Sequence, residues 1–124
     1  MNNTDIISKI ETITKTDSEL KATYSYMSAL SIAPDVILEK LTLLDTLKQM
    51  MHDGVVNFVF KKVNGEIREA FGTRADDVLK LHGSTPSGKR KPSPSTFPYY
   101  DIEKGDWRCF KPESLIRICA DYTI

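Results

Sequence analysis

Apolar residues at helical spacing open the chain and predict two short helices. Ile6, Ile10 and Ile13 are separated by four and three positions, so they lie on one face of a helix. The segment that follows fits a capping box, with Thr16 as the N-cap and Glu19 in the first turn. The helix that begins there is expected to carry Leu20, Tyr24 and Met27 on one side.

A longer apolar stripe predicts a third helix between Pro34 and Gly54. Proline suits the first position of a helix, and glycine suits the position just after its end. The stripe consists of Ile37, Leu41, Leu44 and Met51, with Leu43, Leu47 and Met50 beside it. Its width predicts burial against the rest of the protein, with dimerisation through the same face as the alternative.

The pattern changes from helical to extended after Gly54. Residues 55–63 and 67–71 are rich in β-branched and aromatic side chains, and Asn64-Gly65 between them is a strong hairpin signal. A two-residue loop there would place Lys61 opposite Arg68 and Phe60 opposite Glu69. A glutamate opposite Phe60 fits a core poorly, so this pairing contains a local inconsistency.

The remaining residues predict three more strands and a long loop. Residues 74–81 are expected to form one or two helical turns, and residues 112–114 a single turn. Residues 84–98 hold four prolines and cannot form a regular helix or a central strand, so we expect a long mobile loop. Strands are expected at 99–102, 107–110 and 115–120.

Together these elements predict an α+β fold in two parts. Residues 1–53 form a helical segment of two to three helices, packed on or extending from a small five-stranded SH3-like or Sm-like β-barrel over residues 54–124. Composition supports this boundary, because residues 1–53 hold five lysines and eight acidic residues, whereas residues 54–124 hold twelve basic and nine acidic residues. The β part is therefore the basic part.

Overall composition excludes several classes of protein. The charges of seventeen basic and seventeen acidic residues cancel, which excludes a histone-like protein that binds through a high net positive charge over its whole chain. No run approaches the ~18 apolar residues of a membrane span, and the N-terminus has no signal-peptide pattern. Cys109 and Cys119 are expected to be buried free thiols in a reducing cytoplasm. Two cysteines and two histidines do not form a zinc-finger pattern, so we expect no metal or cofactor.

Two motifs in the β part carry a resemblance to a known family. The hairpin motif V-x-F-x-[FY]-K-K-x-[ND]-G-x-I-R-x-A-x-G-T is present at residues 56–73. The motif F-x-Y-Y-D-x-E-K-G-x-W-R-x-F-K-x-x-x-L-I is present at residues 97–116. Over about residues 50–120 the chain resembles the small WYL-like proteins with an Sm-like SH3 β-barrel fold, common in gut bacteria, their phages and mobile elements.

The resemblance implies a function for the β part. Broader WYL domains are regulatory domains, often in transcription factors and defence systems, that bind nucleic acid or a nucleotide-like ligand. The tripeptide Trp-Tyr-Leu is absent here and no helix-turn-helix domain is recognisable. These two absences argue against sequence-specific recognition of a DNA operator by this protein.

Basic residues in the β part are the first candidates for a binding site. Lys61 opposite Arg68 would be a like-charged cross-strand pair, which an anion above it could stabilise. Lys89, Arg90 and Lys91 form a compact cluster in the predicted loop, of the kind that attracts phosphate backbones. In each case the alternative is a pair or loop that is only solvated.

Aromatic residues on the predicted third and fourth strands are the second candidates. Strand alternation prevents all of them from being buried. An exposed Tyr99 or Trp107 beside Arg108 and Lys111 could form a stacking platform for bases. The alternative is that a small barrel needs most of its aromatic residues in its core.

The sequence favours a non-enzymatic function, because it has no phosphate-binding glycine loop, no paired catalytic carboxylates and no histidine motif. The first hypothesis is an accessory or regulatory protein of a bacterium or phage that binds nucleic acid through the basic face of the barrel. The second is a protein-interaction module in which the helices and the barrel groove bind a partner or a second copy. The third is a sensor of a small anionic ligand.

Overall fold

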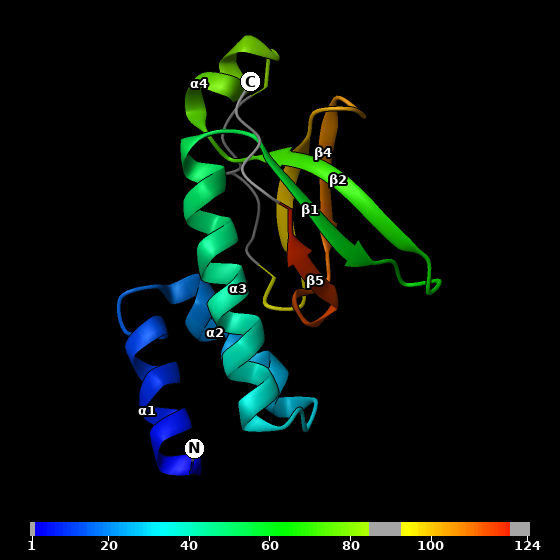
Figure 1. The fold of residues 1–124 in the computed structure, drawn as a ribbon. Helices are drawn as coiled ribbons and strands as arrows, with labels where there is room; N and C mark the ends of the chain where they lie inside the picture. Colours follow the sequence, from blue (N-terminus) through cyan, green and yellow to red (C-terminus); the bar gives the residue numbers. More distant parts are fainter. Residues whose placement is uncertain (1, 85–92, 120–124) are drawn as a thin grey trace.

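Three helices form the N-terminal part of the structure, a computed structural model that describes residues 2–84 and 93–119 (Figure 1). They are α1 (Asn3–Thr14), α2 (Ser18–Ala29) and α3 (Pro34–Asp53). The helix α3 begins at Pro34 and ends before Gly54, as its sequence predicts. Among the described residues no helix is long and apolar enough to cross a membrane.

The cap of α2 differs from the predicted capping box. Asp17, and not Thr16, is the N-cap, and its Oδ1 accepts a hydrogen bond from the Leu20 backbone N–H at 3.1 Å. The Glu19 carboxylate does not complete the box, because it pairs with Arg74 and Lys48.

Five antiparallel strands follow the helices, which confirms the predicted α+β fold with a β-barrel of the SH3-like and Sm-like kind. The sheet order is β4-β3-β2-β1-β5, and a short helix and a 3-10 turn connect strands at its ends. The elements are β1 (Val56–Lys61), β2 (Ile67–Thr73), α4 (Asp76–Leu81), β3 (Phe97–Asp101), β4 (Asp106–Phe110), η1 (Pro112–Ser114) and β5 (Leu115–Ile118).

The register of the β1–β2 hairpin is shifted by one residue from the prediction. Lys61 lies opposite Ile67 and Phe60 lies opposite Arg68, so the predicted Lys61–Arg68 pair is wrong. The cause is the turn: Lys62 N–H bonds to the Glu66 carbonyl, and Gly65 N–H bonds to the Lys62 carbonyl. Only Gly65 within this turn has a positive φ, whereas a two-residue type I′ loop needs two such residues.

This shift removes the inconsistency that the predicted pairing contained. Glu69 lies opposite Val59 and is exposed, whereas Phe60 faces the core. Because side chains alternate along a strand, Arg68 is on the same face of β2 as Ala70, which is fully buried. Arg68 is therefore the inward-facing residue nearest the hairpin loop.

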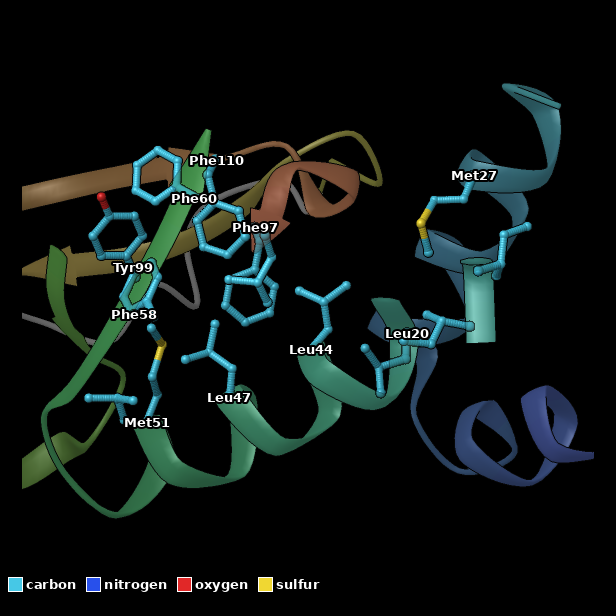
Figure 2. Close-up of a cluster of buried hydrophobic side chains, with 14 of the residues drawn as sticks. Leu20, Met27, Leu44, Leu47, Met51, Phe58, Phe60, Phe97, Tyr99 and Phe110 are labelled. Carbon is cyan, nitrogen blue, oxygen red and sulfur yellow. The ribbon is translucent and has the colours of Figure 1, made fainter. Parts of the chain in front are cut away.

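The helix α3 lies between the other two helices and the sheet (Figure 1). Leu44, Leu47 and Met51 point from α3 toward aromatic side chains of the sheet (Figure 2). Leu20 and Met27 of α2 belong to the same cluster of buried residues. The wide apolar stripe of α3 thus packs in the core of one chain. This agrees with the prediction of burial against the rest of the protein, and not with the alternative of dimerisation through this face.

An ion network ties α2 and α3 to the sheet. Arg74, which directly follows β2, donates to both oxygens of Glu19 at 2.8 and 2.9 Å and to the Pro98 carbonyl at 2.9 Å. Its guanidinium lies 3.9 Å from the centre of the Phe97 ring. Lys48 of α3 pairs with Glu19 at 2.8 Å.

Candidate nucleic-acid interface

A pocket of about 850 Å³ lies where the β1–β2 hairpin, the inner faces of β3 and β4, and η1 meet. Among the described residues, five cationic residues and one acidic residue line it. The charged and phenolic residues in its wall are Lys61, Lys62, Arg68, Arg108, Lys111, Glu113 and Tyr99. The pocket therefore combines a basic wall with an apolar floor, to which Phe60 and Phe110 contribute.

Strand alternation explains how the arginines reach this pocket. Arg108 lies opposite Tyr99 in the β3–β4 pair, and Phe110 lies opposite Phe97 two positions further along. Phe97, Tyr99 and Phe110 are core residues, so Arg108 shares the inward face of β4 with Phe110. Arg68 occupies the equivalent inward position on β2.

The ion pair between Arg68 and Asp101 fixes one of the two arginines. Asp101 is fully buried, its Oδ2 accepts from Arg68, and its Oδ1 accepts from the Lys104 backbone N–H at 2.9 Å. The Arg68 side chain keeps 20% of its surface exposed. A guanidinium anchored in this way is held in place before any anion arrives.

The other cations differ in how they are balanced. Lys62 pairs with Glu66 at 3.5 Å. Lys61, Arg108 and Lys111 are exposed, and their side chains form no ion pair within residues 2–84 and 93–119. The charges of Arg108 and Lys111 are available to an anionic ligand in the pocket, whereas strand alternation places the Lys61 side chain on the outer face of β1.

Tyr99 follows the second of its two predicted alternatives, as a core residue and not as an exposed stacking platform. It is fully buried and packs edge-on against Phe58, with ring centres 5.1 Å apart. Its hydroxyl points away from α3 (Figure 2) and has no hydrogen-bond partner in residues 2–84 and 93–119. Burial raises the pKa of Tyr99 to about 12, although the nearby charges of Arg68 and Arg108 oppose that increase.

Trp107 is not brought to the pocket. It lies opposite Tyr100 on the other face of the β3–β4 pair, and its Nε1 donates to Ser84 Oγ at 3.0 Å. The predicted cluster of Lys89, Arg90 and Lys91 lies outside the described residues. Of the nine candidate residues, the pocket unites Lys61, Arg68, Tyr99, Arg108 and Lys111.

Glu113 is a pocket residue that the sequence did not single out. Its Oε2 accepts a hydrogen bond of 2.8 Å from the Tyr26 hydroxyl, and its Oε1 is buried without a partner among the described residues. Burial and the neighbouring Glu113 raise the pKa of Tyr26 to about 12. The turn at residues 112–114 was predictable, but its partner on α2 is 87 positions away and gives no local signal.

A second contact from the helices supports the same wall of the pocket. Lys40 of α3 donates from its Nζ to the Leu115 carbonyl at 2.7 Å, directly after η1. Together with Tyr26, it holds the segment that carries Lys111 and Glu113. The helices therefore help to position the pocket as well as to fill the core.

Cys109 and Cys119 are free, but Cys109 is exposed and not buried as predicted, since it lies on the outer face of the edge strand β4. Within the described part of the chain, no three His, Cys, Asp or Glu side chains are grouped as metal ligands would be.

Comparison with known proteins assigns the fold to a family. Residues 44–116 match the WYL_2 family, which has an Sm-like SH3 beta-barrel fold, and the chain therefore belongs to this family. The match begins within α3 and includes both motifs that suggested the resemblance.

One curated relative of the chain is a phage protein. The chain is 35% identical over 82 residues to the uncharacterized 11.5 kDa protein in the Gp31-cd intergenic region of Enterobacteria phage T4. The matched part covers 64% of this chain and 80% of the phage protein. No solved structure matches the chain.

Proposed function

We propose that this protein is a non-enzymatic accessory or regulatory protein of a phage or bacterium that binds nucleic acid through the basic pocket of its barrel. The observation that carries the proposal is the presence of five cationic residues around one concave surface, with both arginines on the inward face of the sheet. The similarity to an uncharacterized phage protein supports the phage setting.

Electrostatics favours a phosphate ligand at this surface. Phosphates attract clustered lysine and arginine side chains and release counterions on binding, so such binding weakens as salt rises. Lys61, Arg108 and Lys111 supply exposed charge, and Arg68 supplies a guanidinium that Asp101 already orients. An anchored guanidinium loses less conformational freedom on binding than a free one.

A small anionic ligand is the second candidate, because the pocket is concave and both arginines line it. Protein interaction through the helices has less support. The large apolar side chains exposed on the described helical part are Ile7, Leu30 and Val36, at 38%, 49% and 39% exposure, and they lie in or beside different helices. No groove is defined by these three residues.

Fluorescence anisotropy with labelled single- and double-stranded DNA and RNA, at about 50 and 200 mM salt, tests the proposal. We expect affinity to fall by about tenfold or more across this range, because several phosphates are contacted. The double variant Arg108→Ala/Lys111→Ala should weaken binding at low salt and reduce the salt slope by about 2. The matched control Lys9→Ala/Lys15→Ala removes two exposed lysines of the α1 region and should bind as the wild type does.

Three outcomes are decisive. Failure to bind any strand at the lower salt contradicts the proposal, and binding of a fluorescent mononucleotide alone would favour the small-ligand function. An unchanged slope in the pocket variant, with a reduced slope in Lys89→Ala/Arg90→Ala/Lys91→Ala, would move the site from the pocket to the predicted basic loop.

A further inference from the structure

The basic pocket contains one carboxylate whose position is fixed. We propose that Glu113, held by Tyr26, makes this pocket selective for a nucleotide whose base carries an exocyclic amino group. The inference rests on the proposed function and adds a preference among bases to it.

Two buried hydrogen-bonding atoms of the pocket residues have no partner within the part of the chain that the structure describes. Glu113 Oε1 is buried and unpaired, while Oε2 is occupied by the Tyr26 hydroxyl at 2.8 Å. The Tyr99 hydroxyl is also buried and unpaired. Buried polar groups in native proteins are usually satisfied, so two exceptions in the wall of one pocket point to a ligand that pairs with them.

The charge of Glu113 restricts what that ligand can be. An ionised carboxylate only accepts hydrogen bonds, so its partner must bring an N–H or O–H donor. A ligand that offers phosphate alone would be repelled by this group, although the surrounding cations attract it. The pocket therefore suits a ligand with negative charge at one end and donors at the other, which describes a nucleotide.

The base that fits best is one with an amino group. Cytosine, adenine and guanine each present exocyclic N–H donors, and Glu or Asp is a recognised acceptor for the cytosine amino group. Thymine and uracil present a single ring N–H between two carbonyl oxygens, and these oxygens would lie against the carboxylate. Glu113 should thus favour cytosine over thymine.

A base can reach these atoms only if side chains at the pocket move. Glu113 Oε1 and the Tyr99 hydroxyl are shielded from solvent. Lys61, Arg108 and Lys111 line the same pocket and are exposed, and exposed side chains change rotamer within nanoseconds. Tyr26 and Lys40 meanwhile hold the wall that carries Glu113.

The test compares oligodeoxycytidine with oligothymidine, each of about 12 nucleotides, by anisotropy at the lower salt. The wild type should bind oligodeoxycytidine about tenfold more tightly, the discrimination expected of one base contact. Glu113→Gln keeps the size of the side chain and an acceptor for Tyr26, and it should bring the ratio close to one with an unchanged salt slope. Tyr26→Phe should lower the ratio by releasing Glu113, and the exposed control Glu103→Gln should keep it.

The results separate this inference from the function on which it rests. Salt-dependent binding with equal affinity for both strands overturns the base preference and leaves nucleic-acid binding in place. A tenfold ratio that persists in Glu113→Gln also overturns it, because the preference then has another source. No binding to either strand contradicts both, and competition by free dCMP and dTMP distinguishes a strand from a single nucleotide.

Discussion

At Gly72 the sheet approaches the core so closely that no side chain fits. A Cβ atom at this position would lie 2.6 Å from Tyr99 Cδ2, 3.0 Å from Phe58 Cε1 and 3.2 Å from Met51 Cε. Tyr99 and Phe58 are fully buried and pack against each other. The glycine therefore sets the position of the ring that forms part of the pocket wall.

We expect Gly72→Ala to lower the free energy of unfolding by about 1–3 kcal/mol, the cost of overpacking a dense core. Urea denaturation followed by circular dichroism measures this change. Gly54→Ala is the matched control, because a Cβ there meets nothing within 4 Å, and its effect should stay within about 0.5 kcal/mol. Equal midpoints for the two variants would show that the contact at Gly72 is not tight.

Residue-scale prediction from sequence succeeded where strand alternation alone decides burial. It left open whether Tyr99 is buried, because nothing local shows that a glycine on the neighbouring strand leaves room for its ring. It also missed Glu113, because its hydrogen-bond partner Tyr26 is on a distant helix.

At the scale of elements, Glu19 joins α2 to α3 and to the end of β2. Burial alone would raise the pKa of this carboxyl, but the hydrogen bonds and charges of Arg74 and Lys48 outweigh burial and lower the pKa to about 2. Because the folded pKa is below the usual value of 4.5, this group stabilises the fold above that pH. The contribution is lost as pH falls toward 2.

The free energy of unfolding, measured by urea denaturation between about pH 4.5 and pH 2, should therefore fall more steeply in the wild type than in Glu19→Gln. Over this range the wild type should lose about 2 kcal/mol more of its free energy of unfolding than the variant loses. Glu11→Gln removes an exposed carboxylate of α1 and should keep the wild-type dependence. Parallel curves for the wild type and Glu19→Gln would refute this role of the ion network.

Element boundaries were predictable from sequence where the signals are local. Pro34 and Gly54 bracket α3 because caps and helical periodicity act within a few residues. The hairpin register was not predictable, because Asn64-Gly65 is compatible with loops of different length, and the turn that forms gives a positive φ to Gly65 alone. The N-cap of α2 is Asp17 and not Thr16, and Glu19 is engaged by the distant Arg74, which no local signal shows.

At the scale of the whole molecule, the fold followed from the order of helical and extended segments, whereas the pocket did not. Its wall comes from β1, β2, β3, β4 and η1, so five separate parts of the chain must be assembled before the charges converge. The sequence could indicate which residues are basic, but the shifted hairpin register places Lys61 and Arg68 on opposite faces, whereas the predicted pairing places them on one face. It could not indicate that Lys61, Arg68, Arg108 and Lys111 surround one concavity.

Amide chemical shifts of the isotope-labelled protein, recorded during titration with a short single-stranded oligonucleotide at about 50 mM salt, test the location of the site most directly. We predict that the largest changes fall at the hairpin end, residues 61–65, and at residues 108–114, with α1 unaffected. Changes confined to α1 and α2, or to residues 85–92, would contradict the assignment of nucleic-acid binding to the barrel pocket.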